Sequence, residues 1–504
     1  MSNYVFLRSI VVLLLITITL SMFSSGTLRA QGEKEKLVII SPHWEGIRKE
    51  YEAAFREWYK AKYGKDVEIE WLAMGTSDCL KYIEDQFSKH PESIGIDIFW
   101  GGGVDPYMKL ASEGLLYPFK DIPEEILGKI PKDIGGIPVY DEECRWFGTA
   151  LSGFGVIYNK KVLEAEKLAE PNTWEDLAKP EYLGWIMSAD PRHSGSTHMC
   201  YEIMLQAYGW ERGWEIIVLL GANVKKFTQH SSEVPEAVAA GEAACGLAID
   251  FYAWSAIAKY GIERIGYVMP EGLTVINPDS IAILKGAPHL DIAKEFVKFV
   301  LSKEGQKLWM LKAGDPEGPK EYTLGRMCVI PELYDELSER SIVPLNPFEI
   351  KNVIKYNTTK GSIRWVLIND LIGATIIDVH EDLVKAWKSL ISAQKELEKM
   401  GIKSDKIDQA YKELITPFIS EEEALTLSKK WSDQSFRNTM ISKWHEEAIR
   451  RYNKIASLAN EAVEEARTRA MYQFWGRVVG GIVAIAVIII AIVIVVRRRR
   501  ASRP

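Results

Sequence analysis

Residues 194–197 have the types and spacing expected of an anion-binding segment. Ser194, Gly195, Ser196 and Thr197 stand in a row at the start of a predicted helix near 196–208. The first amides of a helix have no partner within the helix, and together with the helix dipole they favour a negative charge. Either serine could instead simply cap the helix. The segment is a candidate cradle for a phosphate or carboxylate group.

A second set of residues carries side chains that could hold a metal ion. His43 and Glu45 follow the first predicted strand, and Asp250 and Tyr252 follow a later one. Ferric ion prefers phenolate and carboxylate oxygens, which makes Glu45, Asp250 and Tyr252 candidate metal ligands. Glu45 could equally compensate the dipole of the helix that it begins. No resident cofactor is predicted, and ferric iron is one candidate for a transported ligand.

Two glycines and a tryptophan offer further contacts to a ligand. Gly101 and Gly102 would let backbone amides approach it closely, although a tight turn explains them as well. Trp44 offers an aromatic surface for stacking, although most tryptophans simply pack in a core. These residues therefore join the candidate ligand-binding set.

The candidate residues lie at the ends of elements that alternate between strands and helices. Six short apolar strands are predicted in two sets, at 37–40, 67–71, 96–100, 185–188, 224–227 and 245–249. The segments between them include helices whose apolar residues recur every three or four positions. Such an order is typical of mainly parallel sheets covered by helices, with ligands at the carboxyl ends of the strands. The sequence therefore predicts an α/β protein with two lobes.

From residue 385 the character of the chain changes. Residues 385–475 are charged, favour helix and contain almost no glycine, and Ser420 with Glu423 has the spacing of a capping box. This pattern predicts a helical stalk.

Both ends of the chain are apolar. Residues 1–30 show the charge, apolar stretch and small residues of a signal peptide, with an uncleaved anchor as the alternative. Residues 478–496 are uncharged and long enough to cross a bilayer as one transmembrane helix. The arginines that follow in the basic tail 497–504 place that end in the cytoplasm by the positive-inside rule. We therefore expect a single-pass protein of the cell membrane with most of its chain outside the cell.

The charge of the chain excludes one class of partner. The chain has 62 basic and 69 acidic residues, a net charge of −7, and several of the basic residues lie in or beside its two apolar ends. The part between the ends is therefore more acidic still, and such a surface repels nucleic acid.

Several short motifs occur in one order along the chain. They are SPHWE at 41–45, DIFWGG at 97–102, FGVIYNK at 154–160, TWEDL at 173–177, DPRHSG at 190–195 and PDSIA at 278–282. Together they resemble the family 1 extracellular solute-binding proteins of ABC importers, in the branch with ferric-iron, thiamine and aminoethylphosphonate binders. The resemblance covers about residues 37–390, and a C-terminal membrane anchor resembles the archaeal style of these proteins.

The resemblance implies a periplasmic-binding-protein-like fold of type II. Residues 37–152 would form lobe I, completed by 280–384, and residues 153–279 would form lobe II. A small solute or metal ion would bind in the cleft, the lobes would close on it by a hinge, and the protein would deliver it to ABC permease subunits. Asp279, within the last motif, joins the implied ligand-binding residues.

The same resemblance bears on iron. Ferric-binding members of the family carry paired tyrosines where this chain has Phe251 and Tyr252, so only one of the two matches. The missing tyrosine makes a small organic or phosphate-bearing ligand at least as plausible as iron.

Two other functions are compatible with an extracellular domain on a membrane helix. A sensor ectodomain would share the fold, but the short cytoplasmic tail would require a partner chain for signalling. A tethered surface hydrolase is the other alternative, although the sequence contains neither GxSxG nor HExxH. We expect a binding protein and no enzyme.

Overall fold

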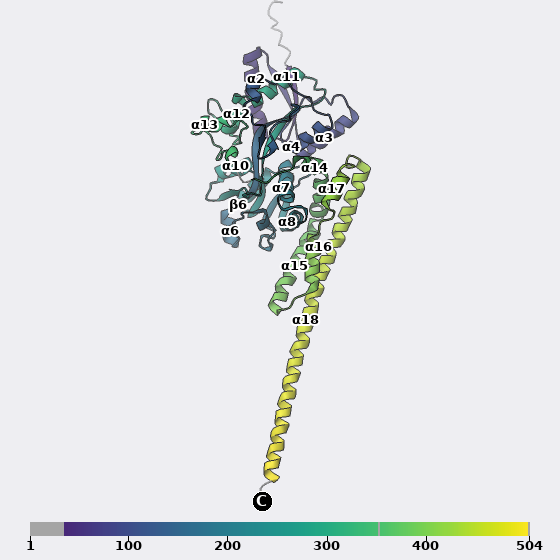
Figure 1. Cartoon of the computed structure of the whole chain (residues 1–504). Coiled ribbons are helices and arrows are strands. Elements are labelled where there is room, and N and C mark those ends of the chain that lie inside the picture. The colour runs from purple at the N-terminus through teal and green to yellow at the C-terminus, as the bar shows by residue number, and fades with distance from the viewer. Residues whose placement is uncertain (1–34, 351–352, 502–504) are drawn as a thin grey trace, which may run out of the picture.

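A mixed β-sheet runs through both lobes of the computed structural model, which describes residues 35–350 and 353–501. Its strands follow the order β2-β1-β3-β11-β6-β9-β7-β8, and β10 pairs with β6. Figure 1 shows the two α/β lobes and the long helix that leaves them. The predicted signal peptide, 1–30, lies outside the described residues.

Lobe I begins with the βαβαβ order that the sequence predicted. The strands β1 and β2 and the strands β1 and β3 pair in parallel. Gly64 ends the first helix with a φ of 69°, a left-handed conformation that glycine adopts readily. The elements are β1 (Glu35–Ser41), α2 (Glu45–Tyr63), β2 (Val67–Ala73), α3 (Thr76–Lys89), β3 (Ile98–Trp100) and α4 (Val104–Ser112).

Lobe II repeats this alternation around β7, β8 and β9, whose predicted positions are confirmed within one residue. A capping box of Thr173 and Asp176 begins a short 3-10 helix, Trp174–Ala178. The elements are β7 (Ile186–Ala189), α7 (Gly195–Tyr208), α8 (Trp210–Asn223), β8 (Val224–Thr228), α9 (Glu233–Ala240), β9 (Cys245–Ile249), α10 (Asp250–Tyr260) and β10 (Ile265–Val268).

Two long strands connect the lobes. The first half of β6 (Phe147–Asn159) pairs with β11 (Ile276–Ile283), and its second half pairs with β9 and β10. After β11 the chain returns to lobe I, where α11 (Leu290–Leu301) and α12 (Lys303–Met310) pack against α2. The cleft between the lobes therefore lies beside these crossing strands.

The helices after residue 357 form a unit of their own, which we call the C-terminal helical unit. They are α14 (Thr358–Ile372), a π-helical turn (Gly373–Ile377), α15 (His380–Met400), α16 (Asp405–Ile415), α17 (Glu421–Ser428) and the part of α18 (Gln434–Ala501) that ends at Ala466.

This unit differs from the predicted division of the chain. Helix α14, expected within lobe I, lies between the lobes and packs against α4 and α7. The predicted stalk folds into this unit: α15 and α16 pack against α8 of lobe II, and α18 packs against α15, α16 and the π-helical turn. Buried residues such as Trp444, Tyr452 and Ala466 lie on the packed side of α18. Its apolar residues recur at helical spacing, and this lets one face of α18 join the core.

Beyond Ala466 helix α18 continues away from the lobes, as Figure 1 shows in yellow. Among the described residues it is the one helix long and apolar enough to cross a membrane, and the predicted span 478–496 lies within it. Its apolar side chains, from Val479 to Val496, are exposed. A water-facing helix of this composition would be unstable, so it fits a membrane segment.

Candidate functional site

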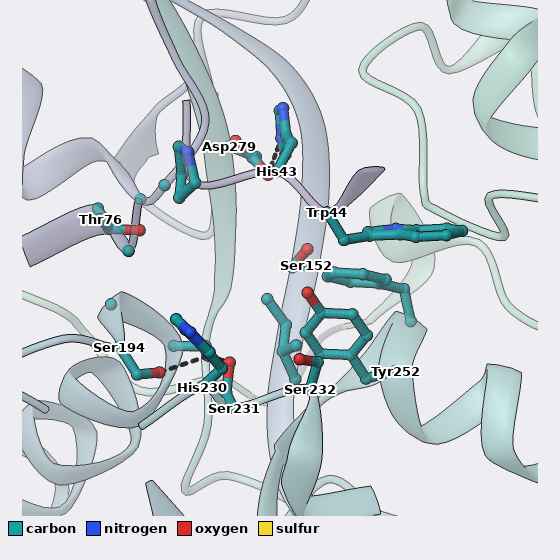
Figure 2. A pocket seen from close by; sticks show the side chains of 18 of the residues that line it. His43, Trp44, Thr76, Ser152, Ser194, His230, Ser231, Ser232, Tyr252 and Asp279 are labelled. Atoms are coloured by element: carbon teal, nitrogen blue, oxygen red, sulfur yellow. Dashed lines mark hydrogen bonds and ion pairs between the residues drawn. The ribbon is translucent and has the colours of Figure 1, made fainter. Parts of the chain in front are cut away.

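A cavity of about 360 Å³ lies between the lobes and is lined from both sides. Lobe I contributes the segments after β1, β2 and β3, and lobe II contributes the starts of α7, α9 and α10. Figure 2 shows Trp44 and Tyr252 on one side of the cavity and Ser194, His230 and Ser231 on the other. This is where parallel α/β sheets place their ligands, at the carboxyl ends of the strands.

Six helices begin at the wall of this cavity. Their N-cap residues, all in the cavity lining, are Trp44 (α2), Gly75 (α3), Gly103 (α4), Ser194 (α7), Ser232 (α9) and Ile249 (α10). Of the six, only Ser194 accepts a hydrogen bond with its own side chain, from the amide of Thr197 at 3.2 Å. Helix N-termini carry partial positive charge and amide donors without intrahelical partners, so the wall as a whole favours an anion.

The charged side chains of the wall reinforce this preference. Two arginines, Arg48 and Arg326, line the cavity, and the imidazoles of His43, His193 and His230 add hydrogen-bonding groups to the lining. Among the described lining residues, Asp279 is the one that bears a carboxylate. The Nε of Arg48 is buried and has no hydrogen-bond partner among the described residues.

Asp279 is neutralised within the wall. Its carboxylate forms an ion pair with Arg326 and lies 3.2 Å from Nε2 of His43. Burial alone would raise the pKa of Asp279, but the charges of Arg326 and His43 hold that pKa below its usual range. Burial also lowers the pKa of His43. The negative charge of Asp279 is therefore balanced locally and does not repel an anion in the cavity.

Arg326 is held firmly in place. Its Nη2 donates to Oγ of Ser152 at 2.9 Å, and its guanidinium lies 4.5 Å from the ring centre of Phe251. Neither Arg326 nor Arg48 is among the residues predicted from the sequence. Arg326 lies in a segment without regular structure and far along the chain from the other site residues, so no local pattern indicates it. Arg48 could have been found, because it falls in the first turn of the helix that follows Trp44.

The structure brings most of the predicted ligand-binding residues to the cavity wall. Those in the lining are His43, Trp44, Gly102, Ser194, Gly195, Ser196, Tyr252 and Asp279. Gly101 and Thr197 are absent from the lining. The amide of Gly101 donates to Ser280 in the sheet, and the amide of Thr197 donates to Ser194.

The structure also leaves Glu45 and Asp250 outside the lining. The carboxylate of Glu45 points into solvent and pairs with Nζ of Lys49 at 2.7 Å. Asp250 is buried and accepts the amides of Gly153 and Phe251, both at 2.7 Å. Glu45 therefore fits the second interpretation of its sequence position, in which its charge compensates the dipole of α2 in the first turn.

The candidate metal ligands Glu45, Asp250 and Tyr252 are not brought together. The carboxylate of Glu45 pairs with Lys49 at the surface, and that of Asp250 accepts backbone amides. Of the three, only Tyr252 lines the cavity. Within the ranges 35–350 and 353–501 no group of three or more His, Cys, Asp or Glu side chains is arranged to hold a metal ion.

Residues 96–319 match the family model described as bacterial extracellular solute-binding protein. Over this part of its length, which includes lobe II and both crossing strands, the chain is similar to bacterial extracellular solute-binding proteins. The chain is 24% identical over 253 residues to the phosphoglycerate transport regulatory protein PgtC of Salmonella typhimurium. That match covers 50% of this chain and 58% of the relative, so it spans little more than half of that protein.

Two solved structures share the fold. The periplasmic binding protein AfuA of Actinobacillus pleuropneumoniae, with bound fructose 6-phosphate, is 20% identical with a TM-score of 0.55, and the match covers 67% of this chain and 98% of AfuA. Iron-bound HitA of Pseudomonas aeruginosa is 18% identical with a TM-score of 0.50, with 66% and 99% covered. The predicted α/β class and periplasmic-binding-protein-like fold are therefore confirmed, and the relatives in this family are binding proteins.

Proposed function

We propose that this chain is a membrane-anchored receptor that captures a small anionic solute bearing a phosphate group and delivers it to an ABC permease. The observation that carries the proposal is the convergence of six helix N-termini on one cavity. Each N-terminus presents amide donors, and a tetrahedral phosphate has enough oxygens to accept from several of them at once.

The side chains around these amides support the same ligand class. Thr76, Ser196 and Ser231 add hydroxyl donors to the lining, and Arg48 adds a cation whose Nε lacks a partner among the described residues. A phosphate oxygen that accepts from Arg48 forms a charge-assisted hydrogen bond, which is the stronger kind. The cavity has more donors than acceptors, which is the opposite of what a cation needs.

The aromatic side of the cavity suits the rest of such a solute. Trp44 and Tyr252 face the cavity from different lobes, as Figure 2 shows. An organic body attached to the phosphate would gain contact with these rings, while inorganic phosphate would not. We therefore expect an organic phosphate to bind more tightly than free phosphate.

The named ligands of the relatives fall into two classes. PgtC is named for phosphoglycerate transport and AfuA holds fructose 6-phosphate, whereas HitA holds iron. For this chain the donor-rich wall favours the first class. Ferric iron as the transported ligand is the weaker proposal, because Tyr252 is the one phenol in the lining and Asp279 is already neutralised.

The membrane anchor supports delivery to a permease. We propose that 478–496 of α18 crosses the membrane, with the arginines from Arg497 onward in the cytoplasm. The last buried residue of α18 is Ala466, so eleven residues separate the folded part from the apolar span. In a helix these eleven residues extend about 16 Å along the axis. The cleft would therefore stay close to a permease in the same membrane.

Calorimetric titration of the full chain in lipid nanodiscs tests the ligand class. The probes are 3-phosphoglycerate, fructose 6-phosphate, inorganic phosphate and ferric citrate. We expect the organic phosphates to bind more tightly than inorganic phosphate. Binding of ferric citrate with no binding of either organic phosphate would overturn the proposal.

Neighbouring residues of α2 provide a matched pair of variants. Arg48→Met removes a cation from the lining and should weaken binding of the organic phosphate about 10- to 100-fold, the size of one hydrogen bond to a charged group. Lys49→Met removes the same charge one position on, where the side chain is half exposed and pairs with Glu45, and should leave the affinity unchanged. Equal effects of the two variants would mean that only net charge matters and that Arg48 does not touch the ligand.

A further inference from the structure

Helix α14 joins the two lobes from outside the cleft. A single continuous apolar core includes Leu80 and Tyr107 of lobe I, Ile203 of lobe II, and Trp365 and Leu371 of α14. The hinge of the fold consists of the two crossing strands, so this shared core is an additional connection. Its contacts must be broken if the lobes are to separate.

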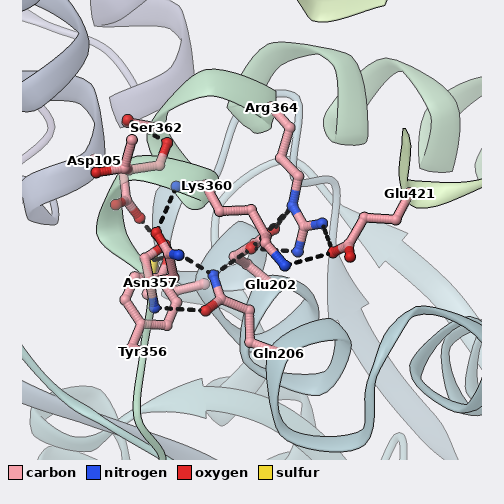
Figure 3. Close-up of polar contacts among 11 residues, drawn as sticks. Asp105, Glu202, Gln206, Tyr356, Asn357, Lys360, Ser362, Arg364 and Glu421 are labelled. Atoms are coloured by element: carbon pink, nitrogen blue, oxygen red, sulfur yellow. Dashed lines mark hydrogen bonds and ion pairs between the residues drawn. The ribbon is translucent and has the colours of Figure 1, made fainter. Parts of the chain in front are cut away.

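On the side of lobe II, α14 is held by buried charges. Arg364 and Glu202 of α7 are both fully buried, with Nη2 of Arg364 2.7 Å from Oε1 of Glu202. Nη1 of Arg364 also donates to Glu421 at 2.6 Å. Figure 3 shows this network between α14, α7 and the start of α17. Breaking such a pair leaves an uncompensated charge in the core, so α14 and lobe II behave as one body.

The hydroxyl of Ser77, at the start of α3, links lobe I both to α14 and to lobe II. It donates to the carbonyl of Pro191 in lobe II at 3.0 Å, and it accepts from Nε1 of Trp365 and Nδ2 of Asn369, both at 3.2 Å. A serine hydroxyl has one donor and two acceptor sites, so its capacity is fully used. Separation of α3 from lobe II would leave these partners buried and unpaired.

A second polar link lies just before the start of α14. The hydroxyl of Tyr356 donates to Oδ2 of Asp105 in α4 at 2.6 Å. Gly361 lets the helix approach this pair closely, because a Cβ at Gly361 would collide with the Tyr356 hydroxyl and lie about 3 Å from both oxygens of Asp105. None of Ser77, Asp105, Tyr356 or Trp365 is among the described residues that line the cavity.

We propose that α14 is an interlobe latch that keeps lobe I closed on lobe II whether or not a solute is bound. The latch consists of Ser77, Asp105, Tyr356, Gly361 and Trp365, with their contacts above. Lobe II, α14 and α18 then form one body fixed to the membrane, and lobe I is the part that moves. The cleft is preformed, and release of the latch, rather than the arrival of solute, limits its opening.

Interlobe distances measured by pulsed electron paramagnetic resonance test the latch with no solute added. The full chain in nanodiscs carries spin labels at the exposed positions Lys60 in lobe I and Glu164 in lobe II, and, in a second sample, at Glu164 and Asn453 of α18. Cys144, the native cysteine that is not fully buried, is changed to Ser in all samples. The unaltered latch should give a single narrow distance between the lobes. A broad distribution there would overturn the proposal.

Two latch variants open the lobes by different means. The double variant Ser77→Ala, Tyr356→Phe removes the two polar links made by these hydroxyls. Gly361→Ala wedges α14 away from α4 while favouring the helix itself. In each the ratio of open to closed protein should rise at least about tenfold, while the distance from Glu164 to Asn453 stays fixed.

A matched control makes the same chemical changes outside the latch. Ser255→Ala with Tyr260→Phe lies on α10 of lobe II and should keep the single closed distance. Closed distances in both latch variants, with the Glu164 to Asn453 distance showing that they are folded, would overturn the proposal. The result does not depend on the identity of the ligand, so it stands or falls separately from the proposed function.

Discussion

Replacement of Arg364 by methionine should destabilise the protein more than any comparable change at its surface. Arg364 and Glu202 are both fully buried, and three N···O contacts of 2.7 to 3.1 Å join them. Without the arginine, Glu202 keeps one hydrogen bond, from Gln206 at 2.7 Å, and remains a buried charge. Loss of one partner of such a pair costs about 3–5 kcal/mol, a large part of the ~5–15 kcal/mol that stabilises a typical domain.

The double variant Arg364→Met, Glu202→Leu separates the charge effect from the loss of packing. Both charges are gone and the apolar side chains keep much of the volume, so the free energy of unfolding should return to within about 1–2 kcal/mol of the parent. Glu421 loses Arg364 but is a third exposed and keeps Lys360 at 3.0 Å. Arg212→Met is the control, because Arg212 pairs with glutamates at the surface, half exposed, and should cost at most about 1 kcal/mol.

Urea unfolding of the full chain in nanodiscs, followed by tryptophan fluorescence at neutral pH, measures these differences. A cost for Arg364→Met no larger than that for Arg212→Met would refute the reasoning, because it would mean that water reaches Glu202. A double variant as unstable as the single one would also refute it, since packing and not charge would then hold α14.

Three further outcomes are expected. Burial lowers the pKa of His198 to about 4, whereas the unfolded value is near 6.5. Between these two pH values the unfolded chain binds a proton that the folded chain does not, so the free energy of unfolding falls as pH falls, by up to about 3 kcal/mol. In urea unfolding between pH 7.5 and 4.5, His198→Gln should lack this contribution to the loss of stability. Glu45→Ala should leave the calorimetric affinity for organic phosphates unchanged, because the side chain faces solvent, and a tenfold loss would return Glu45 to the site. A chain that ends at residue 474 should elute as a single species in size-exclusion chromatography without detergent, and persistent aggregation would show that apolar surface remains elsewhere.

Local patterns in the sequence predict much of the fold. The strand before His43 and the amphipathic helix after it follow from apolar spacing, and both are found as expected. The segment at Ser194 was identified for the same reason, because serine and glycine at a helix start have a local physical cause. These features depend on residues that are close in the sequence.

The part of the site that the sequence did not reveal depends on tertiary contacts. Arg326 reaches the cavity only because Asp279, Ser152 and Phe251, all distant in the sequence, surround its guanidinium. Asp250 stands in the predicted place but turns its carboxylate toward backbone amides, which a residue type alone does not predict. The position of a residue at a strand end therefore predicts proximity to the cleft but not the direction of its side chain.

The role of the C-terminal helices was hidden for a related reason. The charged, glycine-poor composition of 385–475 is common to a free stalk and to a helix packed along one face. Trp431 and Trp444 distinguish the two, because both are buried against α14 or its neighbours, and the indole of Trp431 donates to Asp370 at 2.8 Å. Tryptophans within a charged, helix-favouring segment were the available sign that part of the segment packs against a core.

The net charge of the chain and the preference of its cavity have opposite signs, and the two act over different distances. The net charge of −7 is spread over a large surface, and salt screens its effect beyond about 8–10 Å. Helix N-termini and Arg48 act at hydrogen-bond distance inside a cavity, where screening is weak. An acidic surface can therefore exclude nucleic acid while the cleft still binds a small anion. The charge that decides the ligand is the charge of the cavity wall, and helix starts contribute much of it without appearing in any count of basic residues.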